Sequence, residues 1–205
     1  MKQNRRFIYL ISPSNIIEQT FYKDLIEIFK SNKIAYFQLR LKNTNNKRII
    51  LIGKKIMRIC KKFKVKFIIN DNPKIAKLVS ADGCHLGQKD TKILIARKIL
   101  KKKIIGVTCH NSVNLVNQAI NLGADYIAIG AFYKSDTKKT TYLAKINLIK
   151  NVKKITKLPI VAIGGIDSIN FRKLLLHKAN FLAISGYIWN NKKLSPNLAI
   201  KKLFI

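Results

Sequence analysis

Acidic side chains are scarce in this sequence: its 205 residues include 9 Asp and Glu against 41 Lys and Arg, a formal net charge of +32. Such a surplus is typical of a protein that binds a polyanion such as nucleic acid. The lysines, however, are spread along the whole chain and lack the interleaved aromatic residues of a base-stacking surface. We therefore attribute the charge to substitution drift in a chain rich in Lys, Asn and Ile, and expect no specific nucleic-acid partner. The positive electrostatic field of such a protein would still attract doubly phosphorylated small molecules.

Cysteines and long apolar runs are also few. Cys60, Cys84 and Cys109 are odd in number and form no CxxC pair, which argues against a disulfide framework or a zinc site. The apolar run Phe7–Ile11 is too short for the core of a signal peptide, and no stretch approaches the roughly 18 apolar residues of a membrane span. We therefore expect a protein of the reducing cytoplasm without membrane attachment. No Pro/Gly/Ser-rich linker divides the chain, so residues 1–205 are expected to form one domain.

Short apolar runs alternate with longer amphipathic segments. The runs are nearly continuous rather than alternating, as expected for parallel strands covered by helices; they are Phe7–Ile11, Ala35–Leu39, Lys66–Ile69, Gly83–Leu86, Ile104–Val107, Tyr126–Ile129, Ile160–Ile163 and Phe181–Ile184. Helical spacing is clearest in Ile17–Lys30 and Arg48–Phe63. This order predicts an α/β fold, a single (β/α)8 TIM barrel, with a doubly wound open sheet as the alternative.

Three strands are entered through the same local pattern, in which a small residue is followed by Asp82, Asp125 or Asn180 and then by the strand. Side chains of this type hydrogen-bond neighbouring backbone in tight turns. We therefore predict that Asp82 and Asp125 are structural residues at the N-terminal face of the barrel, away from the chemistry.

Barrel enzymes carry their reactive groups at the C-terminal ends of the strands. Alternation along the second strand places Gln38, Arg40 and Lys42 on one side. Gln and Arg are rare on the inward side of a buried strand. Arg binds phosphate oxygens through two hydrogen bonds and Lys adds a point charge, so this set suits a polar ring and a phosphate.

Two of the nine carboxylates, Asp71 and Asp90, fall just past the ends of neighbouring strands. Mg²⁺ is typically held by one or two protein carboxylates together with phosphate oxygens and water. The pair therefore predicts a Mg²⁺–diphosphate site opposite the basic residues of the second strand. The alternative for Asp90 is a helix cap.

The fifth strand is followed by a residue suited to contact a ligand, and strands six to eight are followed by residues suited to a second phosphate. Thr108 can offer a hydroxyl, whereas Cys109 and His110 point to opposite sides of an extended segment and are not expected to form a nucleophile–base pair. A long polar loop follows the sixth strand. Gly164-Gly165 and Ile184-Ser185-Gly186 follow the last two strands, where barrels often bind a phosphate.

Taken together these residues resemble the thiamine phosphate synthase family. The resemblance runs over nearly the whole chain and is carried by Gln38, Arg40, Lys42, Asn70-Asp71, His85-Leu86-Gly87-Gln88, Asp90, Gly106-Val107, His110, Ser135, Thr137, Lys138, Gly164-Gly165-Ile166 and Ile184-Ser185. It implies the joining of a pyrimidine diphosphate to a thiazole phosphate with Mg²⁺. The partners would be these small molecules, and a homo-oligomer is compatible with the sequence.

The resemblance also implies a role for each matching residue. Asp71 and Asp90 would hold Mg²⁺. The diphosphate would be held by Arg40, Lys42, Asn70 and Lys138, of which Arg40, Lys42 and Lys138 would act in catalysis. Gln38 and Thr108 would contact the pyrimidine, with His85 close by. The thiazole phosphate would be held by Ser135, Thr137, Gly165, Ile184 and Ser185.

The sequence departs from the family pattern at several positions. Lys134 replaces the usual Pro, Ser135 the usual Thr and Thr108 the usual Ser, and the segment Thr140–Asn147 lacks the usual glycine. Two rival functions remain. One is a thiazole tautomerase of the same family that uses a His such as His110, although it would need no metal–diphosphate site. The other is a nucleic-acid-binding barrel without activity.

Overall fold

The protein is an eight-stranded parallel β-barrel in a computed structural model that describes residues 6–135 and 143–204. Each strand pairs with its neighbours in sequence, and β1 pairs with β8 to close the ring. The strands are β1 (Ile8–Ile11), β2 (Ile34–Leu39), β3 (Lys66–Asn70), β4 (Gly83–Leu86), β5 (Ile104–Thr108), β6 (Tyr126–Gly130), β7 (Ile160–Ile163) and β8 (Phe181–Ile184). The predicted (β/α)8 barrel is therefore confirmed, and the closed ring excludes the open doubly wound sheet.

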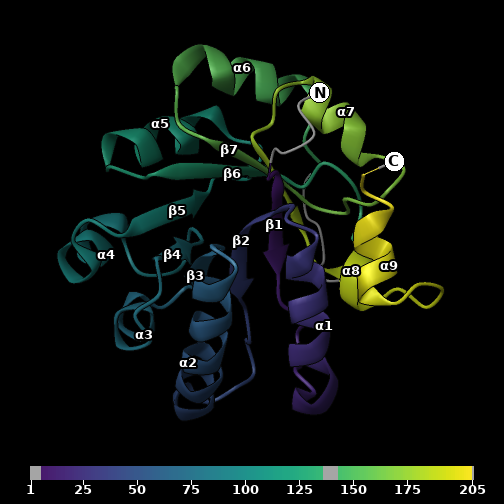
Figure 1. The fold of residues 1–205 in the computed structure, drawn as a ribbon. Helices are drawn as coiled ribbons and strands as arrows, with labels where there is room; N and C mark the ends of the chain where they lie inside the picture. The colour runs from purple at the N-terminus through teal and green to yellow at the C-terminus, as the bar shows by residue number, and fades with distance from the viewer. Residues whose placement is uncertain (1–5, 136–142, 205) are drawn as a thin grey trace.

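Helices surround the barrel (Figure 1). They are α1 (Glu18–Lys30), α2 (Asn46–Lys62), α3 (Pro73–Leu78), α4 (Ile93–Leu100), α5 (Val113–Asn121), α6 (Asn147–Ile155), α7 (Phe171–Leu176), α8 (Gly186–Trp189) and α9 (Pro196–Lys201). The two longest match the predicted segments closely. Helix α2 begins two residues earlier than predicted because the Asn45 side chain caps it by accepting the Arg48 N–H at 2.9 Å.

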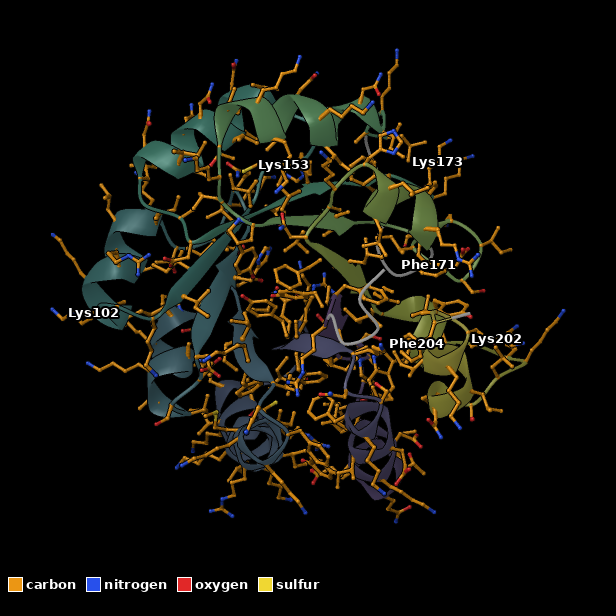
Figure 2. All side chains as sticks on the ribbon, turned by 45° about the horizontal axis from the view of Figure 1, so that its top comes forward. Lys102, Lys153, Phe171, Lys173, Lys202 and Phe204 are labelled. Atoms are coloured by element: carbon orange, nitrogen blue, oxygen red, sulfur yellow. The ribbon has the colours of Figure 1, made fainter. Side chains whose placement is uncertain are left out.

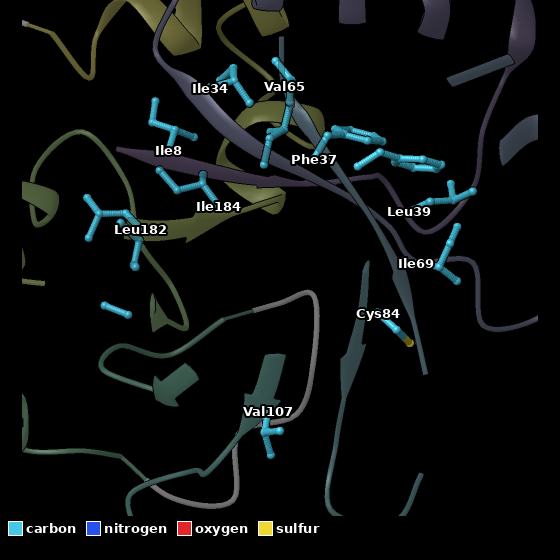
Figure 3. Close-up of a cluster of buried hydrophobic side chains, with 14 of the residues drawn as sticks. Ile8, Ile34, Phe37, Leu39, Val65, Ile69, Cys84, Val107, Leu182 and Ile184 are labelled. Atoms are coloured by element: carbon cyan, nitrogen blue, oxygen red, sulfur yellow. The ribbon is translucent and has the colours of Figure 1, made fainter. Parts of the chain in front are cut away.

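The apolar side chains form two cores on opposite sides of the strands. The larger core contains the helices and the outward strand residues, among them Phe37, Ile69 and Val107 (Figure 3). Phe37 packs against Phe21 and Phe29 of α1. The smaller core fills the inside of the barrel and consists of Tyr9, Ile68, Tyr126, Ala128, Val161 and Ala183. Alternation along each strand divides the residues between the two cores.

The turns that enter three strands use the predicted polar residues structurally. Asp82 accepts the Phe67 N–H at 2.8 Å, and Asp125 accepts the Ile105 N–H at 2.7 Å. Asn180 accepts the Ile160 N–H at 3.0 Å. Each side chain therefore ties the start of its strand to the preceding strand, as the sequence pattern predicted.

Lysines lie at well-separated points around the outside of the barrel, as Lys102, Lys153, Lys173 and Lys202 show (Figure 2). This spread agrees with their even distribution along the sequence. Among the described residues, no helix combines the length and the apolar character needed to cross a membrane.

Candidate active site

The predicted site residues of β2 to β5 meet at the C-terminal end of the barrel. Asn70 and His85 are register partners at the ends of β3 and β4. Asp71 follows β3 in a left-handed conformation, with φ at 63°, and its N–H donates to the His85 carbonyl at 2.7 Å. This turn brings Asp71 beside the loop that follows β4.

Asp71 and Asp90 form the acidic pair that the sequence predicted. The two carboxyls lie close enough to affect each other's ionisation, and Asp90 Oδ2 accepts the Gly87 N–H at 2.7 Å. Burial and the Asp90 carboxyl raise the pKa of Asp71 to about 6, whereas the charges of Lys42 and Arg40 lower it. The four groups are therefore close enough to interact, although they come from three different strand ends.

The acidic pair suits a hard divalent cation. Within residues 6–135 and 143–204 no cluster of three or more His, Cys, Asp or Glu is present, so an all-protein metal cage is not formed there. Two carboxylates beside an Arg and a Lys instead match the pattern in which Mg²⁺ takes its remaining ligands from substrate phosphates and water.

Gln38 is the buried polar residue of β2. It is 2% exposed, and its Nε2 atom has no hydrogen-bond partner among the residues that the structure describes. A buried donor without an acceptor costs about 1–3 kcal/mol, so such groups commonly mark ligand contacts. This orphaned amide agrees with the predicted contact between Gln38 and a polar ring.

Inside the barrel mouth, Thr108 and His85 belong to a chain of hydrogen bonds. His85 Nε2 lies 2.7 Å from Thr108 Oγ1, and His85 Nδ1 lies 2.8 Å from the Tyr126 hydroxyl. The Tyr126 hydroxyl in turn lies 2.7 Å from that of Tyr9. Tyr9 and Tyr126 were not singled out by sequence reasoning. Each could have been found as a tyrosine at an inward-facing position of a short buried strand.

Ser12 is a second residue that sequence reasoning missed. It is 2% exposed; its Oγ accepts the Arg40 N–H at 2.9 Å, and its carbonyl accepts the Ser185 hydroxyl at 3.1 Å. Ser12 therefore joins the ends of β1, β2 and β8 and fixes the backbone that carries Arg40. The feature of the sequence that could have identified Ser12 is its position directly after the first strand.

The loops after β6 and β7 pack against each other. Phe132 N–H donates to Ile163 O at 3.0 Å, and Tyr133 N–H donates to Gly164 O at 3.2 Å. Gly165 has φ at 59°, and a β-carbon there would overlap the Lys134 carbonyl oxygen. Glycine is therefore required at position 165 by close backbone approach as well as by conformation.

The predicted thiazole phosphate residues are placed unequally by the structure. Ser135 lies at the end of the described β6 loop, and Ser185 follows β8 at the start of α8. The Ile184 side chain is buried in the outer core, so only its backbone can face a ligand. Thr137 and Lys138 lie outside the described residues.

Cys109 does not point into the barrel mouth. Its side chain is buried in the outer core, where the thiol contacts the Leu115 carbonyl at 3.4 Å, and burial raises its pKa to about 12. Such a thiol is a poor nucleophile at neutral pH. This position agrees with the expectation that Cys109 and His110 form no catalytic pair.

Known proteins resemble this chain over almost its full length. The sequence model of the thiamine monophosphate synthase family matches residues 8–188. The thiamine-phosphate synthase of Pelagibacter ubique (strain HTCC1062) is 62% identical over 202 residues, which cover 98% of each chain. That of Nitrosomonas eutropha is 39% identical over 158 residues, 77% of this chain and 74% of its own. The chain belongs to the thiamine monophosphate synthase family.

Solved structures agree on the fold of this thiamine monophosphate synthase family member. Thiamine phosphate pyrophosphorylase from Pyrococcus furiosus matches with a TM-score of 0.85 at 24% identity, over 98% of this chain and 95% of that one. A 3-hexulose-6-phosphate synthase matches with a TM-score of 0.66 at 14% identity, over 96% and 98%. The family that the site residues predicted is thus confirmed, together with its barrel.

Proposed function

We propose that this protein is a thiamine phosphate synthase. It joins hydroxymethylpyrimidine diphosphate to hydroxyethylthiazole phosphate and yields thiamine monophosphate and diphosphate. The observation that carries the proposal is the convergence of Asp71 and Asp90 with Arg40 and Lys42 at the barrel mouth. The 62% identity to the Pelagibacter ubique thiamine-phosphate synthase supports it.

In the proposed reaction the bond between the pyrimidine methylene carbon and the diphosphate oxygen breaks, and the thiazole nitrogen supplies the electron pair of the new bond to that carbon. Negative charge therefore grows on the departing diphosphate. Arg40 and Lys42 would stabilise this charge, and Asn70 would donate to the diphosphate. Lys138, outside the described residues, is proposed to act with them.

Asp71 and Asp90 would hold Mg²⁺, which would neutralise the diphosphate charge. Gln38 and Thr108 would orient the pyrimidine, with His85 behind Thr108. Ser135, Thr137, Gly165, Ile184 and Ser185 would hold the thiazole phosphate. Holding two rings in line lowers the barrier without a protein nucleophile, which suits a site where the thiols of Cys84 and Cys109 are buried in the outer core. The proposal includes Mg²⁺ as the cofactor, the two phosphorylated small molecules as partners, and the cytoplasm as the compartment.

The test is to measure diphosphate release from purified protein mixed with both substrates and Mg²⁺. Release that requires both substrates and stops with EDTA is expected. Failure to consume the pyrimidine diphosphate under any metal condition would contradict the proposal. Isomerisation of the thiazole without diphosphate release would support the tautomerase instead. Tight, salt-sensitive binding of duplex DNA without turnover would support the nucleic-acid alternative.

A further inference from the structure

Four side chains form a continuous hydrogen-bonded chain from the middle of the barrel to its mouth. Tyr9 and Tyr126 are each 2% exposed and lie in the inner core, whereas Thr108 is half-buried at the end of β5. His85 connects the two parts through both of its ring nitrogens, at 2.8 Å to Tyr126 and 2.7 Å to Thr108. The direction in which the hydrogens run determines what Thr108 can offer a ligand.

The buried Tyr9 end of this hydrogen-bonded chain sets the direction in which the hydrogens run. Burial raises the pKa of both tyrosines well above the ordinary value, so each hydroxyl keeps its hydrogen. Within the part of the chain that the structure describes, the Tyr9 hydroxyl has one hydrogen-bond partner, the hydroxyl of Tyr126. If Tyr126 donated to Tyr9, the Tyr9 hydrogen would be left in the inner core without an acceptor among the described residues, which is unfavourable.

The favoured arrangement therefore has Tyr9 donating to Tyr126 and Tyr126 donating to His85 Nδ1. A nitrogen that accepts a hydrogen bond carries no hydrogen, so the His85 hydrogen is on Nε2 and is donated to Thr108 Oγ1. The Thr108 hydroxyl then already accepts from His85, and its own hydrogen is directed elsewhere. Thr108 becomes a donor toward the mouth.

Packing holds the chain in place. The Tyr9 ring lies 5.3 Å from that of Tyr36 and 5.8 Å from that of Tyr126, centroid to centroid. The His85 and Tyr126 rings are stacked at 5.6 Å with an interplanar angle of 16°. Gly106 is required for this arrangement because a β-carbon there would overlap the Tyr126 ring.

We propose that Tyr126 is a positioning residue that holds His85 in the Nε2–H tautomer, so that the Thr108 hydroxyl donates to a ring nitrogen of the pyrimidine substrate. The ligand would thus be recognised by an unprotonated aromatic nitrogen rather than by its exocyclic amine. The identity of the ligand rests on the proposed function, whereas the tautomer is a property of the free protein.

The first experiment is nitrogen-15 NMR of histidine-labelled protein without substrates, because the two tautomers have different nitrogen shifts. The chain has three histidines, and His85→Gln assigns the His85 signals. We expect Nε2–H in the wild type and a mixture of tautomers in Tyr126→Phe. Tyr9→Phe is expected to retain Nε2–H, because Tyr126 still donates to His85. A wild-type Nδ1–H tautomer, or a switch in Tyr9→Phe, would overturn the proposal.

The second experiment is kinetic. Tyr126→Phe is expected to raise the KM for the pyrimidine diphosphate several-fold and to leave the KM for the thiazole phosphate unchanged. Tyr36→Phe is the matched control: its ring packs in the same interior, its hydroxyl is outside the chain, and both the tautomer and the KM should stay as in the wild type. Equal KM changes in both variants would refute the positioning role.

The two proposals fail separately. Loss of all diphosphate release with the Nε2–H tautomer intact would contradict the proposed function alone. An active enzyme with the opposite tautomer would contradict the Tyr126 role alone. If Tyr126→Phe does not fold, the wild type and Tyr9→Phe still decide in which direction the hydrogens run from Tyr9 to Thr108.

Discussion

The Tyr126 ring occupies the space that a β-carbon on Gly106 would need, because β5 and β6 place the two residues side by side in the barrel interior. Gly106→Ala must therefore displace the ring or the strand. We expect the free energy of unfolding to fall by about 1–3 kcal/mol, the usual cost of an overpacked core. Urea denaturation measures this change.

Gly53→Ala is the control for that substitution. Gly53 lies in the middle of α2, where a β-carbon would meet Val79 Cγ1 at 3.1 Å, a contact that a side chain can relieve by a small shift. The gain in helix propensity of up to about 1 kcal/mol offsets this contact. A small change in stability for Gly106→Ala, no larger than that for Gly53→Ala, would contradict the overlap at position 106.

Removing a carboxylate at the C-terminal end of the barrel should lower activity, whereas removing one at the N-terminal end should lower stability. Asp71→Ala and Asp90→Ala are expected to reduce kcat/KM by about 100-fold or more, because both lie in the proposed Mg²⁺–diphosphate site. Asp82→Ala should retain kcat/KM but lose about 1–3 kcal/mol of stability, since the Phe67 N–H loses its acceptor. Near-full activity of both mouth variants with Mg²⁺ present would contradict the metal assignment.

The stability of the metal-free protein should depend on Asp71. Its pKa is about 6 in the folded state against an ordinary value of 3.8, so the folded state binds more protons than the unfolded state between these values. The Asp71 contribution is therefore fully present below about pH 4 and is lost as the pH rises through about 6. Thermal unfolding of wild type and Asp71→Asn in EDTA across this range should show a pH-dependent difference; parallel curves would contradict the raised pKa.

Gln38 should contribute to substrate binding rather than to folding. Its buried amide nitrogen has no partner in the described residues, so Gln38→Met should leave the melting temperature unchanged or raise it. The same variant is expected to raise the KM for the pyrimidine diphosphate, as is Thr108→Val. Gln118→Met, at an exposed position of α5, serves as the control for the first. A lower melting temperature with an unchanged KM would assign Gln38 to the core instead.

Short sequence patterns predicted many of the candidate site residues, because such patterns depend on short-range backbone geometry. Alternation along β2 predicted that Gln38 lies with Arg40, and the positions of Asp71 and Asp90 just past the ends of β3 and β4 predicted that both lie at the mouth. The effect of Asp90, Lys42 and Arg40 on the Asp71 pKa agrees with that position. Ser12 was not predicted because its role depends on β2 and β8, which are distant in sequence. The hydrogen bond between the Tyr9 and Tyr126 hydroxyls likewise joins residues 117 positions apart.

The sequence by itself therefore determined the order of strands and helices, the structural turns at Asp82 and Asp125, and the set of residues at the strand ends. These follow from hydrophobic periodicity and from side chains that bond their own neighbourhood. Only the tertiary structure decided that the sheet closes, because closure depends on the pairing of β1 with β8. It also decided that the Asp71 and Asp90 carboxyls lie close enough to interact. The Tyr9–Tyr126–His85–Thr108 chain is continuous for the same reason, since both arrangements bring together side chains of different strands.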